Sequence, residues 1–140
     1  MDKTKLNDEL TAGLVDAAIR AQREAYAPYS KYAVGAALLT ASGEIFIGVN
    51  VENAVFPLTM CAERSAIFSA VSAGHRKFQA IAVATRDGGT PCGSCRQVMA
   101  EFGLEMEVII ADTSGNVRMI TTVAELLPGA FGSQNLNSGG

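Results

Sequence analysis

The 140-residue chain is 49% hydrophobic and 18% charged, and its net charge is −3. This composition is typical of a globular domain with a sizeable core, and it excludes an intrinsically disordered chain. The acidic balance argues against a nucleic-acid partner, because binding to a phosphate backbone calls for a basic surface. No apolar run reaches the roughly 18 residues of a membrane span, and MDKTKLNDEL lacks the apolar segment of a signal peptide. We therefore expect a single domain over residues 1–140, located in the cytoplasm, with no nucleic-acid or membrane partner.

The N-terminal half predicts a helix, a β-hairpin and a second helix. Leucine and alanine residues recur at three- and four-residue steps over residues 5–25, which predicts an amphipathic helix that ends before Pro28. Residues 33–40 and 44–51 are apolar stretches on either side of an Ala-Ser-Gly turn, which is the pattern of a hairpin. A loop follows, and residues 61–74 predict a helix closed by a glycine.

The C-terminal half alternates strands and helices. Residues 78–85 contain almost no polar side chain, which predicts a central strand covered on both faces. A helix over residues 93–102 follows, and strands over 106–112 and 117–122 flank a Thr-Ser-Gly-Asn turn. A short helix comes next, and the polar residues 132–140 predict a flexible tail. Because strands alternate with helices, we expect an α/β fold, a three-layer α/β/α sandwich.

The chain's three cysteines are Cys61, Cys92 and Cys95. They lie at the starts of two predicted helices, where unpaired N–H groups and the helix dipole favour a thiolate, the form that zinc binds. An odd number of cysteines argues against a disulfide framework. The single histidine, His75, lies at the far end of the first of these helices, roughly 20 Å from its start. Three ligands leave a fourth position open, and an open position is the mark of a catalytic zinc site.

Charged side chains lie next to these cysteines in the sequence. Glu63 follows Cys61 by two positions and is a candidate for a proton-shuttling carboxylate in the same cavity. Three thiolates leave a zinc site negatively charged, and Arg64 and Arg96 are candidates to offset this charge by donating hydrogen bonds to the sulfurs. The cysteines could instead be ordinary buried thiols or the ligands of a zinc site without catalytic function. Arg64 and Arg96 could instead be solvent-exposed charges on their helices.

Two sequence motifs that contain these residues resemble those of a known family. CAER at residues 61–64, followed by PCGSCRQV at residues 91–98, is the zinc deaminase signature in its three-cysteine form. From about residue 14 to residue 131 the chain resembles the small, homotetrameric cytidine deaminases, through YAPYSKYAVGAALLT, GVNVENA and ELLPGAFG in the family's order. The resemblance implies a hydrolase with one zinc ion per subunit that deaminates cytidine and 2′-deoxycytidine to uridine and 2′-deoxyuridine. It also implies a mixed five-stranded sheet in the three-layer α/β/α sandwich, a role in pyrimidine salvage and a homotetramer.

The resemblance further implies a role for each residue around the reacting base. The three cysteines bind the zinc ion. Glu63 moves a proton from the attacking water to ring N3 and then to the leaving ammonia. The backbone N–H of Ala62 meets the ring O2, and the carbonyl of Thr90 lies near the amino group.

The sugar and the base also have candidate partners. Asn50 and Glu52 match the family's ribose-binding pair, and their spacing at the end of a predicted strand points both side chains to one side. From the pattern alone, both could be turn residues. Phe131 matches an aromatic residue that a neighbouring subunit contributes, although a core position fits the pattern equally well.

Three positions depart from the family pattern. Tyr32 stands where the family often has a Phe that packs against the base, so its hydroxyl needs a partner. Phe56 replaces a common Tyr, and Ser94 replaces a usual Ala between the cysteines. These departures leave fine substrate preference open, so a modified nucleoside is the nearest alternative substrate. Deaminases that edit polynucleotides typically carry His-x-Glu where this chain has Cys-Ala-Glu.

Overall fold

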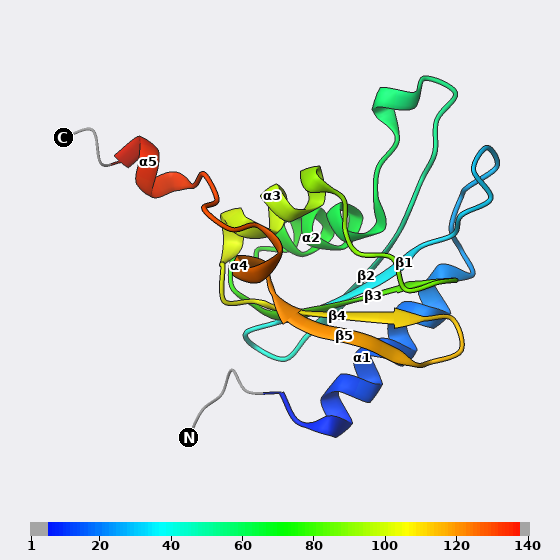
Figure 1. The fold of residues 1–140 in the computed structure, drawn as a ribbon, viewed down its shortest axis with the longest axis horizontal. Coiled ribbons are helices and arrows are strands. Elements are labelled where there is room, and N and C mark those ends of the chain that lie inside the picture. Colours follow the sequence, from blue (N-terminus) through cyan, green and yellow to red (C-terminus); the bar gives the residue numbers. More distant parts are fainter. Residues whose placement is uncertain (1–5, 138–140) are drawn as a thin grey trace.

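A computed structural model describes residues 6–137 (Figure 1). The elements in chain order are α1 (Asp8–Gln22), β1 (Gly35–Thr40), β2 (Ile45–Val49), the 3₁₀ helix η1 (Phe56–Leu58), α2 (Ala62–Ser72), β3 (Phe78–Thr85), α3 (Gly93–Phe102), β4 (Glu107–Asp112), β5 (Val117–Thr122), α4 (Val123–Leu126) and α5 (Ser133–Asn137). The expected start of the first helix at residue 5 and the last tail residues, 138–140, lie outside the described residues. Part of the expected tail forms α5. Over residues 6–137, every helix is too short or too polar to cross a membrane.

The five strands form one mixed sheet in the order β2-β1-β3-β4-β5. β3 and β4 pair in parallel, and all other neighbours pair antiparallel. The parallel pair follows from the connection, because α3 crosses over between β3 and β4. The expected mixed five-stranded sheet is confirmed.

Helices cover both faces of this sheet. α1 lies against one face, while α2, α3 and α4 lie against the other (Figure 1). The strand β1 shows why both faces need cover, because its side chains alternate between two cores. Ala36 and Leu38 pack with α2 and α3, whereas Ala37 and Leu39 pack with α1. β3 is buried in the same way, as its apolar sequence predicts, and the three-layer α/β/α sandwich is confirmed.

Two glycines allow the helices to approach the sheet closely. A Cβ atom at Gly48 in β2 would lie 2.4 Å from the carbonyl oxygen of Ala62 and 2.4 Å from the amide nitrogen of Ala66, so α2 packs directly on this residue. A Cβ atom at Gly35 would meet Ala18 of α1 in the same way, at 2.1 Å from its carbonyl oxygen. Gly48 therefore sets the height of the first turn of α2 above the sheet.

Gly48→Ala should destabilise the protein, because the methyl group collides with backbone atoms that no rotamer change can move. We expect a loss of about 2 to 3 kcal/mol in the free energy of unfolding, measured by urea titration. Gly13→Ala in α1 is the matched control. A Cβ atom there meets nothing within 4 Å, so this variant should be neutral or more stable by about 0.5 to 1 kcal/mol. Equal effects of the two substitutions would contradict the close-approach argument.

Candidate active site

The three cysteine sulfurs converge at one point. Cys61 is the N-cap residue of α2, Cys92 is the N-cap residue of α3, and Cys95 lies in the first turn of α3. The Sγ atom of Cys92 lies 3.9 Å from that of Cys61 and 3.4 Å from that of Cys95, and all three sulfurs lie within 4.8 Å of one another. Three sulfurs at roughly 2.3 Å from a tetrahedral zinc ion are roughly 3.8 Å apart. The geometry therefore fits a single zinc ion.

Positive potential surrounds these sulfurs. The N-termini of α2 and α3 both point at the cluster, and the Nη2 of Arg64 donates a hydrogen bond to the Sγ of Cys61 at 3.3 Å. The pKa of Cys61 is lowered to about 5. The largest cause is a hydrogen bond with the Cys95 thiol, and the hydrogen bond and positive charge of Arg64 add to it. The hydrogen bond between the two cysteines, together with burial, raises the pKa of the Cys95 thiol. The helix N-terminus and Arg64 therefore favour negative charge on Cys61.

The carboxyl group of Glu63 is buried beside this cluster. The residue lies in the first turn of α2 and is 5% exposed. Burial, reinforced by the charge on Cys61, raises the pKa of Glu63 to about 7. A carboxyl group with a pKa near neutrality can both accept and donate a proton, which is what a proton shuttle requires.

A cavity of about 290 Å³ opens beside Cys61, Cys92 and Glu63. It brings together eight of the residues expected from the sequence, namely Tyr32, Asn50, Glu52, Cys61, Ala62, Glu63, Thr90 and Cys92. Ser30, Val34, Thr59, Val83, Thr85 and Gly89 complete its lining. The cavity lies at the carboxyl end of β3, where open α/β sheets usually bind their ligands.

Asn50 and Glu52 are both held by the segment that precedes β1. The Nδ2 of Asn50 donates to the carbonyl of Tyr32 at 2.8 Å, and its Oδ1 accepts from the amide of Val34 at 2.9 Å. Glu52 accepts hydrogen bonds from the Ser30 hydroxyl and from the amides of Ser30 and Tyr29. These hydrogen bonds lower the pKa of Glu52, and the bond from the Ser30 hydroxyl has the largest effect. The lining of the cavity therefore includes a carboxylate that is held in place.

Two expected site residues lie elsewhere. Phe131 is 56% exposed, is not among the residues that line the cavity, and accepts a hydrogen bond from Gln97 on its backbone carbonyl. Arg96 was expected to donate to the sulfurs. Its nitrogens instead donate to the carbonyls of Pro91 at 2.8 Å and Leu126 at 2.7 Å and to the Oγ1 of Thr90 at 3.0 Å. Arg96 thus ties the loop before α3 to the end of α4.

Sequence reasoning missed the residues that shape the cavity wall. Ser30 holds Glu52, the last residue of β3 supplies Thr85, and the loop after β3 supplies Gly89. One signal for this loop was available, because loops at the carboxyl ends of parallel strands commonly carry binding residues. The contacts themselves depend on tertiary distances that no local pattern encodes.

An α/β/α sandwich with three convergent cysteine sulfurs, a buried carboxyl group and an adjoining cavity defines a zinc-site hydrolase. Residues 9–111 match the family model of the cytidine and deoxycytidylate deaminase zinc-binding region, so the chain belongs to this family.

Individual relatives agree with this family. The cytidine deaminase of Sporosarcina psychrophila is 50% identical over 121 residues, which cover 84% of this chain and 88% of that protein. The probable cytidine deaminase of Dictyostelium discoideum is 45% identical over 134 residues, which cover 94% of this chain and 90% of that protein. The crystal structure of cytidine deaminase from Burkholderia pseudomallei is 48% identical and superposes with a TM-score of 0.82, over 90% of this chain and 100% of that one.

Cys92→Ser should weaken zinc binding roughly 100-fold or more, because even an outer hydrogen bond to a metal ligand is worth about 10- to 100-fold. The measurement is the zinc content per chain after dialysis against a weak chelator. Ser94→Ala is the control, since Ser94 is exposed between the two cysteines, and this variant should keep its zinc. Full zinc retention by Cys92→Ser would remove Cys92 from the ligand set.

Proposed function

We propose that this protein hydrolyses cytidine and 2′-deoxycytidine to uridine and 2′-deoxyuridine, with release of ammonia, in pyrimidine salvage. The observation that carries the proposal is the meeting of three cysteine sulfurs and the buried Glu63 at one cavity. The relatives named cytidine deaminase, at up to 50% identity over most of the chain, support the same reaction.

In this proposal Cys61, Cys92 and Cys95 hold the zinc ion. Zinc supplies Lewis acidity that makes a water molecule nucleophilic at neutral pH. The two helix N-termini and Arg64 balance the negative charge of three thiolates, which would otherwise weaken that acidity.

Glu63 is the proposed proton carrier. It accepts one proton from the attacking water and delivers it to N3 of the pyrimidine. It then takes the remaining proton from the new hydroxyl group on C4 and passes it to the amino group, which leaves as ammonia. Overall, one water is consumed, and the exocyclic C4–N bond is replaced by a C4–O bond. The amide of Ala62 and the carbonyl of Thr90 are proposed to orient the ring, through its O2 and its amino group.

Asn50 and Glu52 are proposed to bind the sugar. Ionised Glu52 suits a ribose hydroxyl as a pure acceptor, and it repels a phosphate group. The cavity lining, as far as residues 6–137 describe it, contains neither lysine nor arginine. Both features favour a nucleoside over a nucleotide such as deoxycytidylate.

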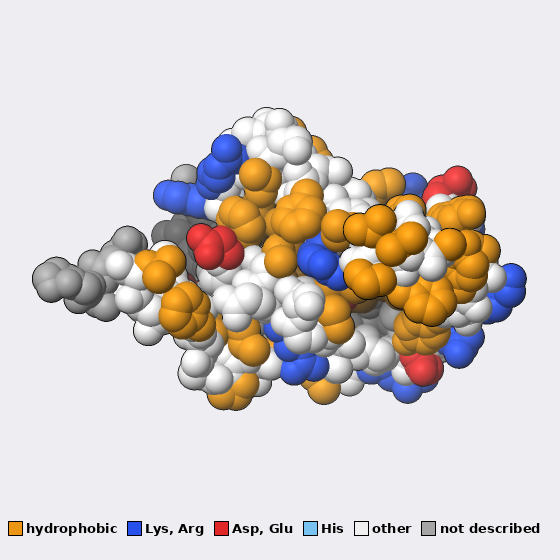
Figure 2. All heavy atoms as spheres, turned by 90° about the horizontal axis from the view of Figure 1, so that it is seen from above, with side chains coloured by type: hydrophobic (Ala, Val, Ile, Leu, Met, Phe, Trp, Pro, Cys, Tyr) orange, Lys and Arg blue, Asp and Glu red, His pale blue; other side chains and the backbone are white. Residues whose placement is uncertain are grey.

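We also propose that the protein is a cytoplasmic homotetramer. A reducing compartment suits three free, clustered cysteines. Val55, Phe56 and Leu58 on the loop around η1 are each more than half exposed, and Figure 2 shows hydrophobic side chains gathered over this end of the molecule. An apolar surface of this kind suits burial against another subunit. Phe131, which is exposed outside its own cavity, is the residue proposed to enter a neighbour's site.

Glu63→Gln tests the proposed reaction. The loss of the proton carrier should lower turnover of cytidine by about 10²- to 10⁴-fold while zinc stays bound. The measurement is the fall in ultraviolet absorbance with cytidine, deoxycytidine, cytosine and cytidine monophosphate, and the wild type should act on the first two alone. Glu101→Gln, on the exposed part of α3, is the matched control and should behave as wild type. Unchanged turnover in Glu63→Gln would reject its role, and an inactive zinc-loaded wild type would reject the function.

The role of Phe131 in a neighbouring site can be tested by mixing subunits. Phe131→Ala should lose most of its activity, since every site then lacks the aromatic side chain. Mixed tetramers of Phe131→Ala and Glu63→Gln chains should regain activity, because a Glu63→Gln neighbour supplies Phe131 to a site that retains Glu63. Activity no higher than that of the diluted parents, in mixed tetramers verified by mass spectrometry, would contradict an intersubunit role.

A further inference from the structure

The hydroxyl of Tyr32 is bound by an aspartate that the sequence analysis did not assign. The ring of Tyr32 lines the cavity, and its hydroxyl donates a hydrogen bond to the Oδ1 of Asp87 at 2.6 Å. This bond is the main reason why the pKa of Asp87 is lowered, so the acceptor is ionised at neutral pH. The guanidinium of Arg86 lies 4.9 Å from the centre of the same ring. The ring is thus held at its edge and against one face.

Gly89 encloses the hydroxyl from another side. A Cβ atom at Gly89 would lie only 2.8 Å from the Tyr32 hydroxyl oxygen, whereas Asp87 Oδ1 and the ring Cζ would be 3.6 and 4.0 Å away. A side chain at position 89 would therefore displace the Tyr32 hydroxyl from its place against Asp87. A phenylalanine at position 32 would leave room for a side chain at position 89.

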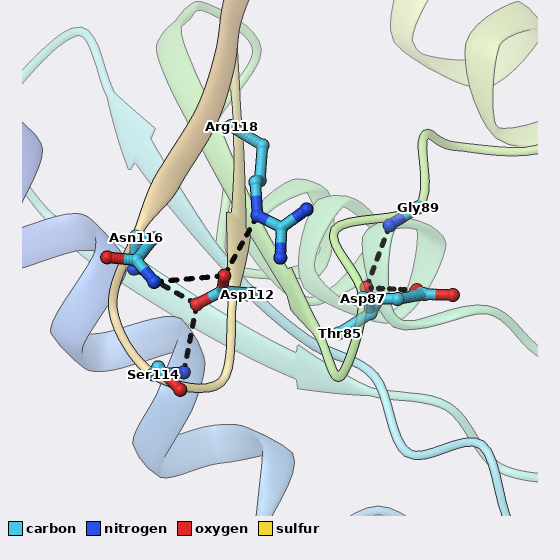
Figure 3. Close-up of polar contacts among 7 residues, drawn as sticks. All are labelled: Thr85, Asp87, Gly89, Asp112, Ser114, Asn116 and Arg118. Atoms are coloured by element: carbon cyan, nitrogen blue, oxygen red, sulfur yellow. Dashed lines mark hydrogen bonds and ion pairs between the residues drawn. The ribbon is translucent and has the colours of Figure 1, made fainter.

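The loop that carries Asp87 and Gly89 is itself fixed. Thr85 donates to the Oδ1 of Asp87 at 3.3 Å and accepts from the amide of Gly89 at 2.9 Å (Figure 3). The side chain of Arg118 packs on the same loop, because a Cβ atom at Gly88 would lie only 2.8 Å from its Cγ.

Arg118 is held in turn by the β4–β5 hairpin. Its Nε donates to the Oδ2 of Asp112 at 2.9 Å. Asp112 is 4% exposed and also accepts from the amides of Ser114 and Asn116 (Figure 3). A buried, fully bonded carboxylate therefore braces the loop that holds the Tyr32 hydroxyl.

We propose that Asp87 is a positioning residue of this active site, which with Gly89 clamps the Tyr32 hydroxyl and so fixes the cavity wall against which the pyrimidine ring packs. We refer to Tyr32, Asp87 and Gly89 as the tyrosine clamp. The inference rests on the proposed function only in that the ligand is a pyrimidine nucleoside. The clamp moves no proton and forms no bond to the reacting atoms. Its contribution belongs to substrate binding, and hence to KM rather than to kcat. It is particular to chains with Tyr at this position, because Phe has no hydroxyl to clamp.

Substitutions at Tyr32 and Asp87 test the effect on binding. Tyr32→Phe and Asp87→Ala should each raise KM for cytidine about fivefold, because a ring that is no longer held must be immobilised again when the substrate binds, with kcat within about twofold. The double variant should be no worse than either single variant, because both remove the same bond. Asp87→Asn should stay near wild type, since its amide oxygen still accepts the hydroxyl. Tyr26→Phe, at an exposed tyrosine outside the cavity, is the control.

A second double-mutant cycle tests the clamp through the melting temperature and needs no measurement of activity. Gly89→Ala should lower the melting temperature in the wild type, where the methyl group meets the hydroxyl. In the Tyr32→Phe background the same change should cost little, because the remaining neighbours are at ordinary contact distance.

The outcomes separate the clamp from the proposed function. Unchanged KM in Tyr32→Phe and Asp87→Ala, or KM effects that add in the double variant, would overturn the positioning role. Equal destabilisation by Gly89→Ala in both backgrounds would overturn the clamp itself. A wild type without turnover would reject the deaminase proposal and the effect on KM together, while the melting cycle would still decide whether the clamp exists.

Discussion

The site depends on the meeting of two helix N-termini at one point beside the sheet. α2 and α3 each have a cysteine as the N-cap residue, and both cover the same face of the sheet. Their dipoles and the Arg64 guanidinium stabilise negative charge on sulfur where charge would otherwise be costly to bury. This electrostatic arrangement suits negative charge on the cysteine sulfurs, and the packing of α2 on Gly48 positions the first turn of α2, which carries Glu63.

The remaining parts of the cavity are preorganised by hydrogen bonds made within the chain. Asn50 and Glu52 hold the segment that leads into β1, and Arg96 ties the loop before α3 to the end of α4. The hairpin β4–β5 braces the loop after β3 through Arg118. Hydrogen bonds thus hold the loops around the cavity, while the cysteines and Glu63 lie at or in the first turns of α2 and α3, an arrangement that suits a precisely built site.

Much of this was predictable from local pattern. Apolar periodicity located the helices and strands, and the clean alternation of elements gave the layered fold. The cysteines and Glu63 were predictable because metal chemistry restricts which residues serve, and because their spacing at helix starts is itself a local feature. The described contacts agree with that part of the prediction, in that the three sulfurs and Glu63 do lie together.

What the pattern could not give was the choice of partner among equally suitable groups. Arg96 is next to a cysteine in the chain, yet its guanidinium donates to Pro91, Thr90 and Leu126. Tyr32 finds Asp87, which is 55 positions away in sequence. Such pairings depend on how loops from separate elements meet. The position of Phe131 relative to a second subunit depends on an assembly that lies beyond a single chain.

The central claim is that Cys61, Cys92 and Cys95 together bind one zinc ion. Zinc-edge X-ray absorption of the purified protein tests it most directly, because the amplitude of the sulfur shell reports how many thiolates surround the metal. The account predicts one zinc per chain with three sulfur neighbours at about 2.3 Å. Two sulfur neighbours, four sulfur neighbours or a chain without zinc would contradict it.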